Sequence, residues 1–406
     1  MPEPLGGGPF AGTRWLTVAG RTLSRRLMIP CPTLECPIPS GLKIRGRLLA
    51  YLIGAALVTG VPMTGLAVAA EVASAAPVRV GNVIDGHVHP SLCVARNGDV
   101  LAVYNKQGGG GKELLLSRST DGGRTWSVAQ PIPGIDHCSI YPGSLTTLST
   151  GRIVLQWSCY HSEGGKLWRQ PQFCTSDDDG RTWSNVREIS LPDLTNYSCL
   201  RHPLLELAPN RWVLPLYDRT IIFDPETSRI EPFGDGRRHG LVPIVKTREG
   251  AILSGAPVAN AALPISTPVD LVRGLRSADQ GRTWQALHAL PTFGVAGYDL
   301  TVLHNGGVVL TSIVYGVGQD GEWAYQLSLS RDDGRTWEFD RAVTVYNPGR
   351  RIAGRGWPRT VQLDPETLGT LFYDLDATQA GGPGVFFVRT PIRALEVAPA
   401  RRVAAQ

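Results

Sequence analysis

One eight-residue pattern, Ser-x-Asp-x-Gly-x-Thr-Trp, occurs four times in the chain and constrains its fold more than any other feature. We call this pattern the octapeptide. Asp can accept hydrogen bonds from the backbone N–H groups ahead of it, Gly permits a positive φ, and Trp supplies a large apolar plate. The octapeptide is therefore predicted to be a tight turn pinned onto a sheet. Its repeated positions are Ser119, Asp121, Gly123, Trp126, Ser176, Asp178, Gly180, Trp183, Ser277, Asp279, Gly281, Trp284, Ser330, Asp332, Gly334 and Trp337.

The spacing of the four copies predicts a repeated architecture. Their Asp residues lie 57, 101 and 53 positions apart, so the middle interval holds a degenerate copy near 223–232. A period near 50 residues is typical of a radial repeat in which each unit is a four-stranded blade. A repeated fold needs one turn four times, whereas catalysis rarely needs four copies of one acid. We therefore favour the structural interpretation of these Asp residues over a catalytic one.

A second pattern sets the number of blades. Each unit opens with a short apolar strand, a turn and another apolar strand, and Pro stands near the start of five of the six units, where it costs no ladder hydrogen bond. We predict an all-β, six-bladed β-propeller with four-stranded antiparallel blades, formed by 77–406 as a single domain. The six openings are 89–104, 141–157, 202–217, 242–256, 299–315 and 357–373.

The first 76 residues read as a leader. Lys43, Arg45 and Arg47 precede an apolar segment, 48–69, and the small residues Ala73-Ser74-Ala75 follow it. This order is that of a secretory signal peptide, so we expect a secreted, extracellular protein. The alternative is that 48–69 stays uncleaved as a membrane anchor, which is the only membrane contact that we expect.

Charge argues against nucleic acid as a partner. The chain has 40 Lys and Arg against 35 Asp and Glu, and seven of these basic and three of these acidic residues belong to 1–76. The remainder therefore holds 33 basic and 32 acidic residues, and such a balance gives no electrostatic attraction for a polyanion.

Five cysteines follow the leader, which leaves at least one unpaired. Cys138 and Cys199 occupy equivalent positions in adjacent blades and form one candidate disulfide; Cys159 and Cys174 flank a hairpin and form a second. Cys93 would then be buried and free, although sequence alone does not determine connectivity. No pair has the spacing of metal ligands, so we expect neither a metal nor a cofactor.

The repeated octapeptide in a six-bladed propeller resembles the sialidase (neuraminidase) superfamily, in which it is called the Asp box or BNR repeat. The first blade, HVHPSLCVARNGDVLAVYN followed by LLLSRSTDGGRTWS, is similar to that of bacterial sialidases in register and turn placement. The resemblance implies a central site where three arginines hold the substrate carboxylate. It also implies a Tyr–Glu nucleophile and an Asp acid/base acting on the anomeric carbon.

The chain departs from the family at several of these positions. Val88 stands where the first Arg is expected, and the acid/base loop is reduced to Lys106-Gln107 and four glycines. The Asn-Glu pair of the family aligns with Leu200-Arg201, and only Arg219 could replace the second Arg. Trp357 takes the place of the nucleophilic Tyr. An active site of this type must therefore be rearranged.

The segments that open the blades supply other chemistry at the predicted centre. We predict Asp136 and Asp299 as catalytic acids and His89 and His137 as bases. The predicted substrate-binding residues are Arg201, Arg237, Arg238, Arg355, Arg359, Trp357 and Tyr298, because arginines suit a carboxylate and aromatic rings suit a sugar face. For each histidine, a hydrogen-bonded strut in the channel is the competing interpretation, and no ligand spacing supports a histidine-bound metal.

Three functions remain open. The first is a glycan-active exo-glycosidase of the exo-α-sialidase type with a non-standard centre. The second is a non-catalytic carbohydrate-binding propeller that kept the scaffold and lost the chemistry. The third is a scaffold that binds protein through its blades. The first two share a glycan or other anionic carbohydrate as partner. The absent family residues favour the second function, and the polar blade openings favour the first.

Overall fold

The computed structural model describes residues 75–82, 88–106, 113–135, 139–200, 202–234, 242–257, 272–290, 297–315, 323–350, 352, 357–377 and 382–397. The apolar segment 48–69 and the rest of the leader before residue 75 lie outside these ranges. Within them, no helix is both long enough and apolar enough to span a membrane.

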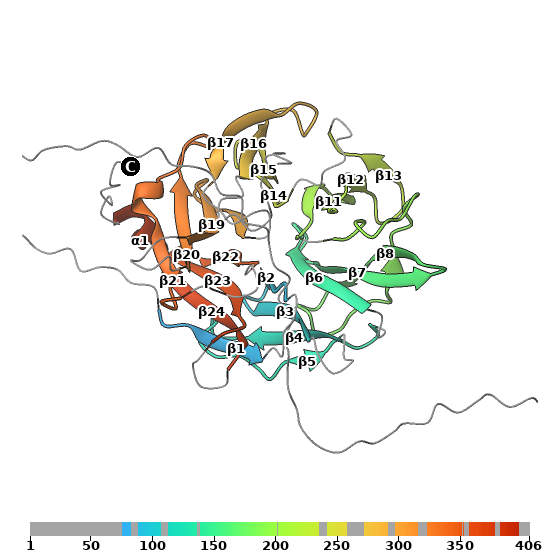
Figure 1. Ribbon diagram of the computed structural model, residues 1–406, viewed down its shortest axis with the longest axis horizontal. Helices are drawn as coiled ribbons and strands as arrows, with labels where there is room; N and C mark the ends of the chain where they lie inside the picture. Colours follow the sequence, from blue (N-terminus) through green and yellow to red (C-terminus); the bar gives the residue numbers. More distant parts are fainter. Residues whose placement is uncertain are drawn as a thin grey trace, which may run out of the picture. The chain divides into compact units, whose positions relative to one another are not determined.

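The described residues form six four-stranded antiparallel sheets arranged around a common centre (Figure 1). Blade 1 comprises β2 (Ser91–Val94), β3 (Val100–Lys106), β4 (Glu113–Ser119) and β5 (Gln130–Pro131). Blade 2 comprises β6 (Ser139–Thr147), β7 (Ile153–Glu163), β8 (Lys166–Ser176) and β9 (Arg187–Glu188). Blade 3 comprises β10 (Leu205–Ala208), β11 (Arg211–Pro215), β12 (Thr220–Phe223) and β13 (Ile230–Pro232).

The other three blades repeat this order. Blade 4 comprises β14 (Ile244–Lys246), β15 (Ile252–Pro257), β16 (Val272–Ser277) and β17 (Gln285–Leu290). Blade 5 comprises β18 (Tyr298–Val302), β19 (Val308–Tyr315), β20 (Trp323–Ser330) and β21 (Val343–Tyr346), with a 3₁₀ turn, Phe339–Arg341, before the last strand. Blade 6 comprises β22 (Arg359–Asp364), β23 (Thr367–Asp374), β24 (Gly384–Pro391) and β1 (Val78–Asn82). The six-bladed propeller and its four-stranded blades are thus confirmed.

Blade 6 joins the two ends of the described chain. Its outer strand is β1, which pairs antiparallel with β24 so that Val78 lies opposite Phe387. This strand stands before the first of the repeated openings, so the sequence pattern did not reveal it. The short helix α1 (Ile392–Val397) follows β24 and buries Ile392 and Leu395 in the core shared with blade 5.

The octapeptide is a hydrogen-bonded turn between the third and fourth strands of blades 1, 2, 4 and 5. In blade 1, the hydroxyl of Ser119 donates to Asp121 Oδ1 (2.8 Å) and accepts from the N–H of Gly123 (2.7 Å). Asp121 also accepts from the backbone N–H (2.9 Å) and the hydroxyl (2.6 Å) of Thr125. The same four bonds recur in the other three copies.

The degenerate position near 223–232 is also a turn. It joins β12 to β13, and Asp224 accepts hydrogen bonds from the N–H groups of Glu226 (2.9 Å) and Thr227 (3.2 Å). Asp224 therefore keeps the role of the octapeptide Asp, although the Ser, Gly and Trp positions have been lost.

The octapeptides also join neighbouring blades. Gly123 lies against Phe387 of blade 6, and Gly281 lies against Phe233 of blade 3. An Arg at the end of the third strand reaches the fourth octapeptide residue of the following blade at three of the seams. These contacts are Arg118 to the Asp179 carbonyl (2.7 Å), Arg276 to the Asp333 carboxylate (2.8 Å) and Arg389 to the Gly122 carbonyl (3.2 Å).

The octapeptide carboxylates should make the fold sensitive to acid. The hydrogen bond from the Thr283 hydroxyl, with the Thr283 N–H and the Ser277 hydroxyl, lowers the pKa of Asp279 to about 2 from 3.8. Matching bonds lower the pKa values of Asp121 and Asp178. A pKa that is lower in the folded chain contributes stability above the unfolded value, and this contribution is lost as the pH falls through the folded one.

We therefore expect the free energy of unfolding in urea to fall between about pH 4 and about pH 2. Thr283→Val removes the first donor to Asp279 and should flatten this pH dependence. An unchanged slope in Thr283→Val would contradict the assignment.

The cysteines differ from both predicted pairs. Cys174 and Cys199 are free and buried, so neither Cys159–Cys174 nor Cys138–Cys199 forms. Cys159 is disulfide-bonded, and its partner lies outside the described residues. Cys93 is buried and free as expected, and burial raises the pKa of its thiol to about 12. The equivalent positions of Cys138 and Cys199 in the repeat did not determine the pairing.

Candidate functional site in the central channel

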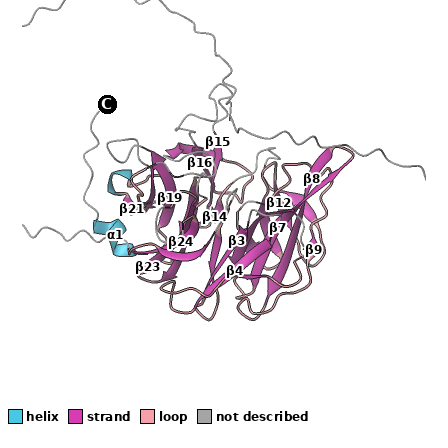
Figure 2. Cartoon of the chain, turned by 60° about the horizontal axis from the view of Figure 1, so that its bottom comes forward, coloured by secondary structure: helices cyan, strands magenta, loops and turns pink. Residues whose placement is uncertain are grey.

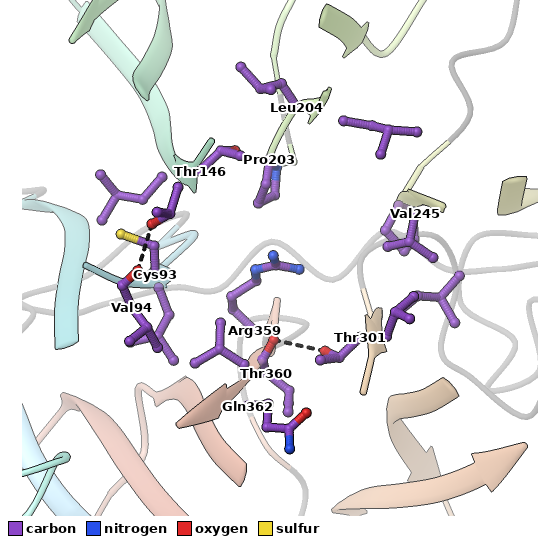
Figure 3. Close-up of a pocket in the computed structure, with 18 of the residues that line it drawn as sticks. Cys93, Val94, Thr146, Pro203, Leu204, Val245, Thr301, Arg359, Thr360 and Gln362 are labelled. Carbon is purple, nitrogen blue, oxygen red and sulfur yellow. Dashed lines mark hydrogen bonds between the residues drawn. The ribbon is translucent and has the colours of Figure 1, made fainter. Parts of the chain in front are cut away.

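The inner strands β2, β6, β10, β14, β18 and β22 surround a channel at the centre of the propeller. Because the octapeptides follow the third strands, they lie at the opposite end of the blades from the first residues of the inner strands. All six strands contribute to the wall of a cavity of about 350 Å³ (Figure 3). Side chains that are far apart in sequence therefore meet at one place.

Asp299 and Arg359 form a buried ion pair across the seam of blades 5 and 6. Arg359 Nη1 donates to both carboxylate oxygens of Asp299, at 2.7 and 2.9 Å, and the Thr360 N–H donates to Asp299 Oδ2 at 2.9 Å. Asp299 is fully buried, and burial raises the pKa of its carboxyl although Arg359 opposes the shift. The two predicted site residues are thus in direct contact with each other.

In this ion pair Arg359 donates only through Nη1, so the Nε and Nη2 donors of its guanidinium are not bonded to Asp299. No described residue accepts a hydrogen bond from its Nε or Nη2. Nε–H and Nη2–H form the side of the guanidinium that binds a carboxylate in two parallel hydrogen bonds. In Figure 3 the guanidinium extends from β22 toward the middle of the cavity. We call the Nε and Nη2 side of Arg359 the open fork.

The described part of the cavity wall offers this cation no second carboxylate. Most of the described lining residues are apolar, among them Leu145, Leu204 and Leu300, and none of them is Asp or Glu. Arg359 is only 18% exposed. A poorly hydrated cation with unused donors favours an anionic ligand, because buried donors left unpaired cost free energy.

Three aromatic side chains from different blades meet where the inner strands begin. The rings of His89 and Trp357 are stacked with centroids 4.0 Å apart, and His202 lies 5.5 Å from Trp357. All three residues are at least 95% buried. Trp357 has a φ of 36°, which is uncommon for a bulky residue and is maintained by its packing. The structure thus brings the predicted residues His89 and Trp357 together.

Tyr298 occupies a different environment from the one expected of a substrate-binding residue. Its side chain is fully buried, and its hydroxyl donates to the carbonyl oxygen of Val242 in blade 4. Burial raises the pKa of this hydroxyl well above its ordinary value. In this conformation, Tyr298 joins blades 4 and 5.

Six predicted site residues fall outside the described residues: Asp136, His137, Arg201, Arg237, Arg238 and Arg355. Val88 and Arg219 are among the described positions that depart from the family pattern. Val88 is fully buried, and Arg219 pairs with Asp218 at 3.1 Å and donates to the backbone carbonyl of Asp193 at 3.3 Å. Arg219 is therefore occupied within blade 3.

Sequence reasoning identified Asp299 and Arg359 but missed that they pair. Each belongs to the first two residues of an inner strand in adjacent blades, and this equivalence was the available signal. The cavity wall was also missed, because its short apolar strands look like ordinary core. Among the described residues, no group of three His, Cys, Asp or Glu side chains is placed to hold a metal.

No protein-family model matches the sequence, and no curated protein matches it significantly. Solved structures do resemble it. A protein of unknown function from Dyadobacter fermentans has a TM-score of 0.56 at 16% identity, covering 78% of this chain and 99% of that one. The intramolecular trans-sialidase from Ruminococcus gnavus, in complex with oseltamivir carboxylate, has a TM-score of 0.56 at 15% identity. The match covers 79% of this chain and 98% of that one.

An α-L-arabinofuranosidase from Fusarium graminearum, in complex with an iminosugar inhibitor, is similar as well. It has a TM-score of 0.52 at 13% identity, covering 80% of this chain and 99% of that one. At such identities the likeness establishes the fold. The chain is a six-bladed propeller of the kind found in sialidases and related glycosidases.

Proposed function

We propose that this protein acts on glycans as an exo-glycosidase of sialidase type with a rearranged centre. The open fork of Arg359 carries the proposal: it is a fixed, poorly hydrated cation with two parallel donors at the channel centre. It is suited to the carboxylate of a terminal anionic sugar. The propeller neighbours described above include a trans-sialidase and an arabinofuranosidase, which supports a sugar as the ligand.

We assign Asp299 a positioning role. Both of its oxygens accept hydrogen bonds from Arg359 Nη1, so it fixes the guanidinium while Nε and Nη2 have no described acceptor. Cleavage of a glycosidic bond also needs an acid that protonates the leaving oxygen, together with a nucleophile or an activated water. Asp136 remains our proposed acid, and His89 and His137 remain our proposed bases.

One set of contacts favours non-catalytic carbohydrate binding as the second candidate. Asp299 and Arg219 are held in ion pairs, and the Tyr298 hydroxyl is bonded to the backbone. These three groups therefore stabilise the scaffold in the present conformation. A binding protein needs the open fork but none of the groups that transfer protons.

The substitution Arg359→Lys in the full chain tests the proposal. Lys keeps the charge beside Asp299 but lacks the planar fork. We expect kcat/KM on a fluorogenic α-sialoside, or binding to sialylated glycans on an array, to fall at least about tenfold, which corresponds to ~1.4 kcal/mol. Arg152→Lys is the matched control, because Arg152 forms a 2.6 Å ion pair with Asp177 on the exposed surface.

Each result decides between the candidates. Turnover that Arg359→Lys reduces and Arg152→Lys spares would support the glycosidase. Array binding without turnover, with the same dependence on Arg359, would support the binding protein. Absence of both signals in the unsubstituted chain would eliminate both candidates.

We also propose that the protein is exported and acts outside the cell. The proposal is supported by the basic, apolar and small-residue order of 43–75. N-terminal sequencing of the protein recovered from culture medium should give a start shortly after Ala75. Recovery of the whole chain in the membrane fraction would instead identify 48–69 as an anchor.

A further inference from the structure

The seam between blades 2 and 3 departs from the pattern of the other seams. The two blades lie side by side (Figures 1 and 2), and blade 3 has the degenerate turn at 223–232 in place of an octapeptide. An octapeptide glycine packs against the preceding blade, as Gly123 and Gly281 do. The degenerate turn contains neither Gly nor Trp for such packing. A cavity of about 350 Å³, lined by residues of both blades, lies at this seam, and we call it the seam pocket.

Two residues of the pocket wall replace residues that recur in the other blades. In blades 1, 2, 4 and 5, the second-strand residue opposite the octapeptide Ser is Val or Ile: Val100, Ile153, Ile252 and Val308. In blade 3 the equivalent residue is Trp212, which lies opposite Phe223. The arginines that cross the seams after blades 1, 4 and 6 have no counterpart in blade 2, where Thr175 stands at that position. Trp212 and Thr175 both line the seam pocket.

The turn before the second strand supplies a third replacement. In blades 1, 2, 4 and 5 this turn contains a glycine with a φ between 85° and 96°: Gly98, Gly151, Gly250 and Gly306. Blade 3 has Asn210 there, with a φ of 56°. Asn adopts a positive φ less readily than Gly, but it adds an amide to the pocket wall. Departures from a repeat that converge on one cavity indicate a functional site, because folding alone favours the repeated residue at each position.

The seam pocket holds a cation that is oriented by an aromatic ring. The guanidinium carbon of Arg187 lies 5.1 Å from the centroid of the Phe173 ring, which packs edge-on against Trp212 at 5.5 Å. Both rings are buried. Arg187 Nη2 lies 3.5 Å from Ser228 Oγ of blade 3, and no described carboxylate pairs with Arg187. Contact with the ring fixes the guanidinium plane, so its remaining donors are available to a carboxylate.

The groups around this cation are mostly neutral. The walls contribute one hydroxyl, two amides and one carboxylate, from Ser184, Asn185, Asn210 and Glu226. Arg152 also lines the pocket, but Asp177 pairs with it at 2.6 Å, which leaves Arg187 as the cation for a ligand. The indole N–H of Trp212 has no acceptor among the described residues. A ring with one carboxylate and several hydroxyls matches this set, because each hydroxyl both donates and accepts hydrogen bonds.

We propose that the seam pocket binds an acidic sugar unit, with the sugar carboxylate on Arg187 and the hydroxyls on the two amides and Glu226. Arg187 favours an acidic sugar over a neutral one, and the neutral groups favour a sugar over a simple inorganic anion. The pocket shares no described lining residue with the central cavity. The inference therefore holds whether or not the centre is catalytic.

Titration of the full chain with glucuronic acid, followed by saturation-transfer NMR, tests the seam pocket. Glucose is the matched probe that lacks the carboxylate, and it should bind at least about tenfold more weakly, because hydrogen bonds between charged groups are the stronger ones. Arg187→Gln should weaken glucuronic acid binding by a similar factor. Arg331→Gln removes an arginine from an exposed ion pair with Glu338 in blade 5 and should change nothing.

The substitution Asn210→Gly distinguishes a binding role from a structural one. Gly adopts a positive φ without steric cost, so the free energy of unfolding in urea should change little. The affinity for glucuronic acid should still fall by about two- to tenfold, because one hydrogen bond to the sugar is lost. Unchanged affinity in both Asn210→Gly and Arg187→Gln would overturn the inference.

The variant Arg359→Lys separates this inference from the proposed function. It changes the central cavity and should leave intact the glucuronic acid binding that depends on Arg187. Binding that is lost in Arg359→Lys and retained in Arg187→Gln would place the acid at the centre and contradict the seam pocket. Absence of glucuronic acid binding, or equal affinities for glucuronic acid and glucose, would also overturn the inference, even if a sialoside is cleaved.

Discussion

The substitution Asp299→Ala is expected to destabilise the protein by about 3–5 kcal/mol, because it leaves the Arg359 guanidinium buried without its counter-ion. Asp299 is fully buried, and its carboxylate accepts hydrogen bonds from both Arg359 and the Thr360 N–H. The substitution therefore also removes a bond between the inner strands of blades 5 and 6. Urea unfolding at neutral pH measures the loss.

The double variant Asp299→Leu/Arg359→Met distinguishes the loss of the whole ion pair from the cost of leaving one buried charge unpaired. Replacing a buried ion pair with apolar residues of similar size is often neutral, so this variant should recover most of the stability lost by Asp299→Ala. It should still lose all sugar binding that depends on the open fork. If the free energy of unfolding of the single variant Asp299→Ala lies within about 1 kcal/mol of that of the unsubstituted protein, this account of the centre is contradicted.

The second large effect is expected at a glycine of the octapeptide. Gly123 has a φ of 86°, and a Cβ atom there would lie 2.0 Å from a ring carbon of Phe387. Gly123→Ala should therefore combine the cost of a left-handed conformation, about 1–2 kcal/mol, with overpacking against blade 6, about 1–3 kcal/mol. The free energy of unfolding should drop by roughly 2–5 kcal/mol.

Gly98→Ala is a matched control because it isolates the conformational part. Gly98 has a φ of 89°, and a Cβ atom there would have no other atom within 4 Å. We expect Gly98→Ala to lose only the conformational cost, about 1–2 kcal/mol. Equal losses in the two variants would show that the octapeptide is a local turn without a role between blades.

The repeat made most of the fold predictable. Octapeptide spacing and the six openings located the inner strands to within a few residues, because both patterns follow from the requirements of a turn and of a strand start. The outer strand β1 of blade 6 was not predicted, because Val78–Asn82 contains no repeated sequence pattern. Its position is fixed only when the ring closes on β24.

The candidate site was less predictable because it depends on contacts across blades. Sequence patterns suggested Asp299 and Arg359 separately, but only the packing of β18 against β22 shows that they pair and leave the open fork. Tyr298 shows the converse, since a residue at a polar blade opening proved to be part of the core.

A crystal structure of the full chain soaked with a terminal anionic sugar, N-acetylneuraminic acid, tests the central claim most directly. We expect the sugar carboxylate in the channel, with its two oxygens about 3 Å from Nε and Nη2 of Arg359 and the Asp299–Arg359 pair intact. A sugar bound elsewhere while the open fork stays without a carboxylate would contradict the assignment of Arg359 as the anchor of the glycan.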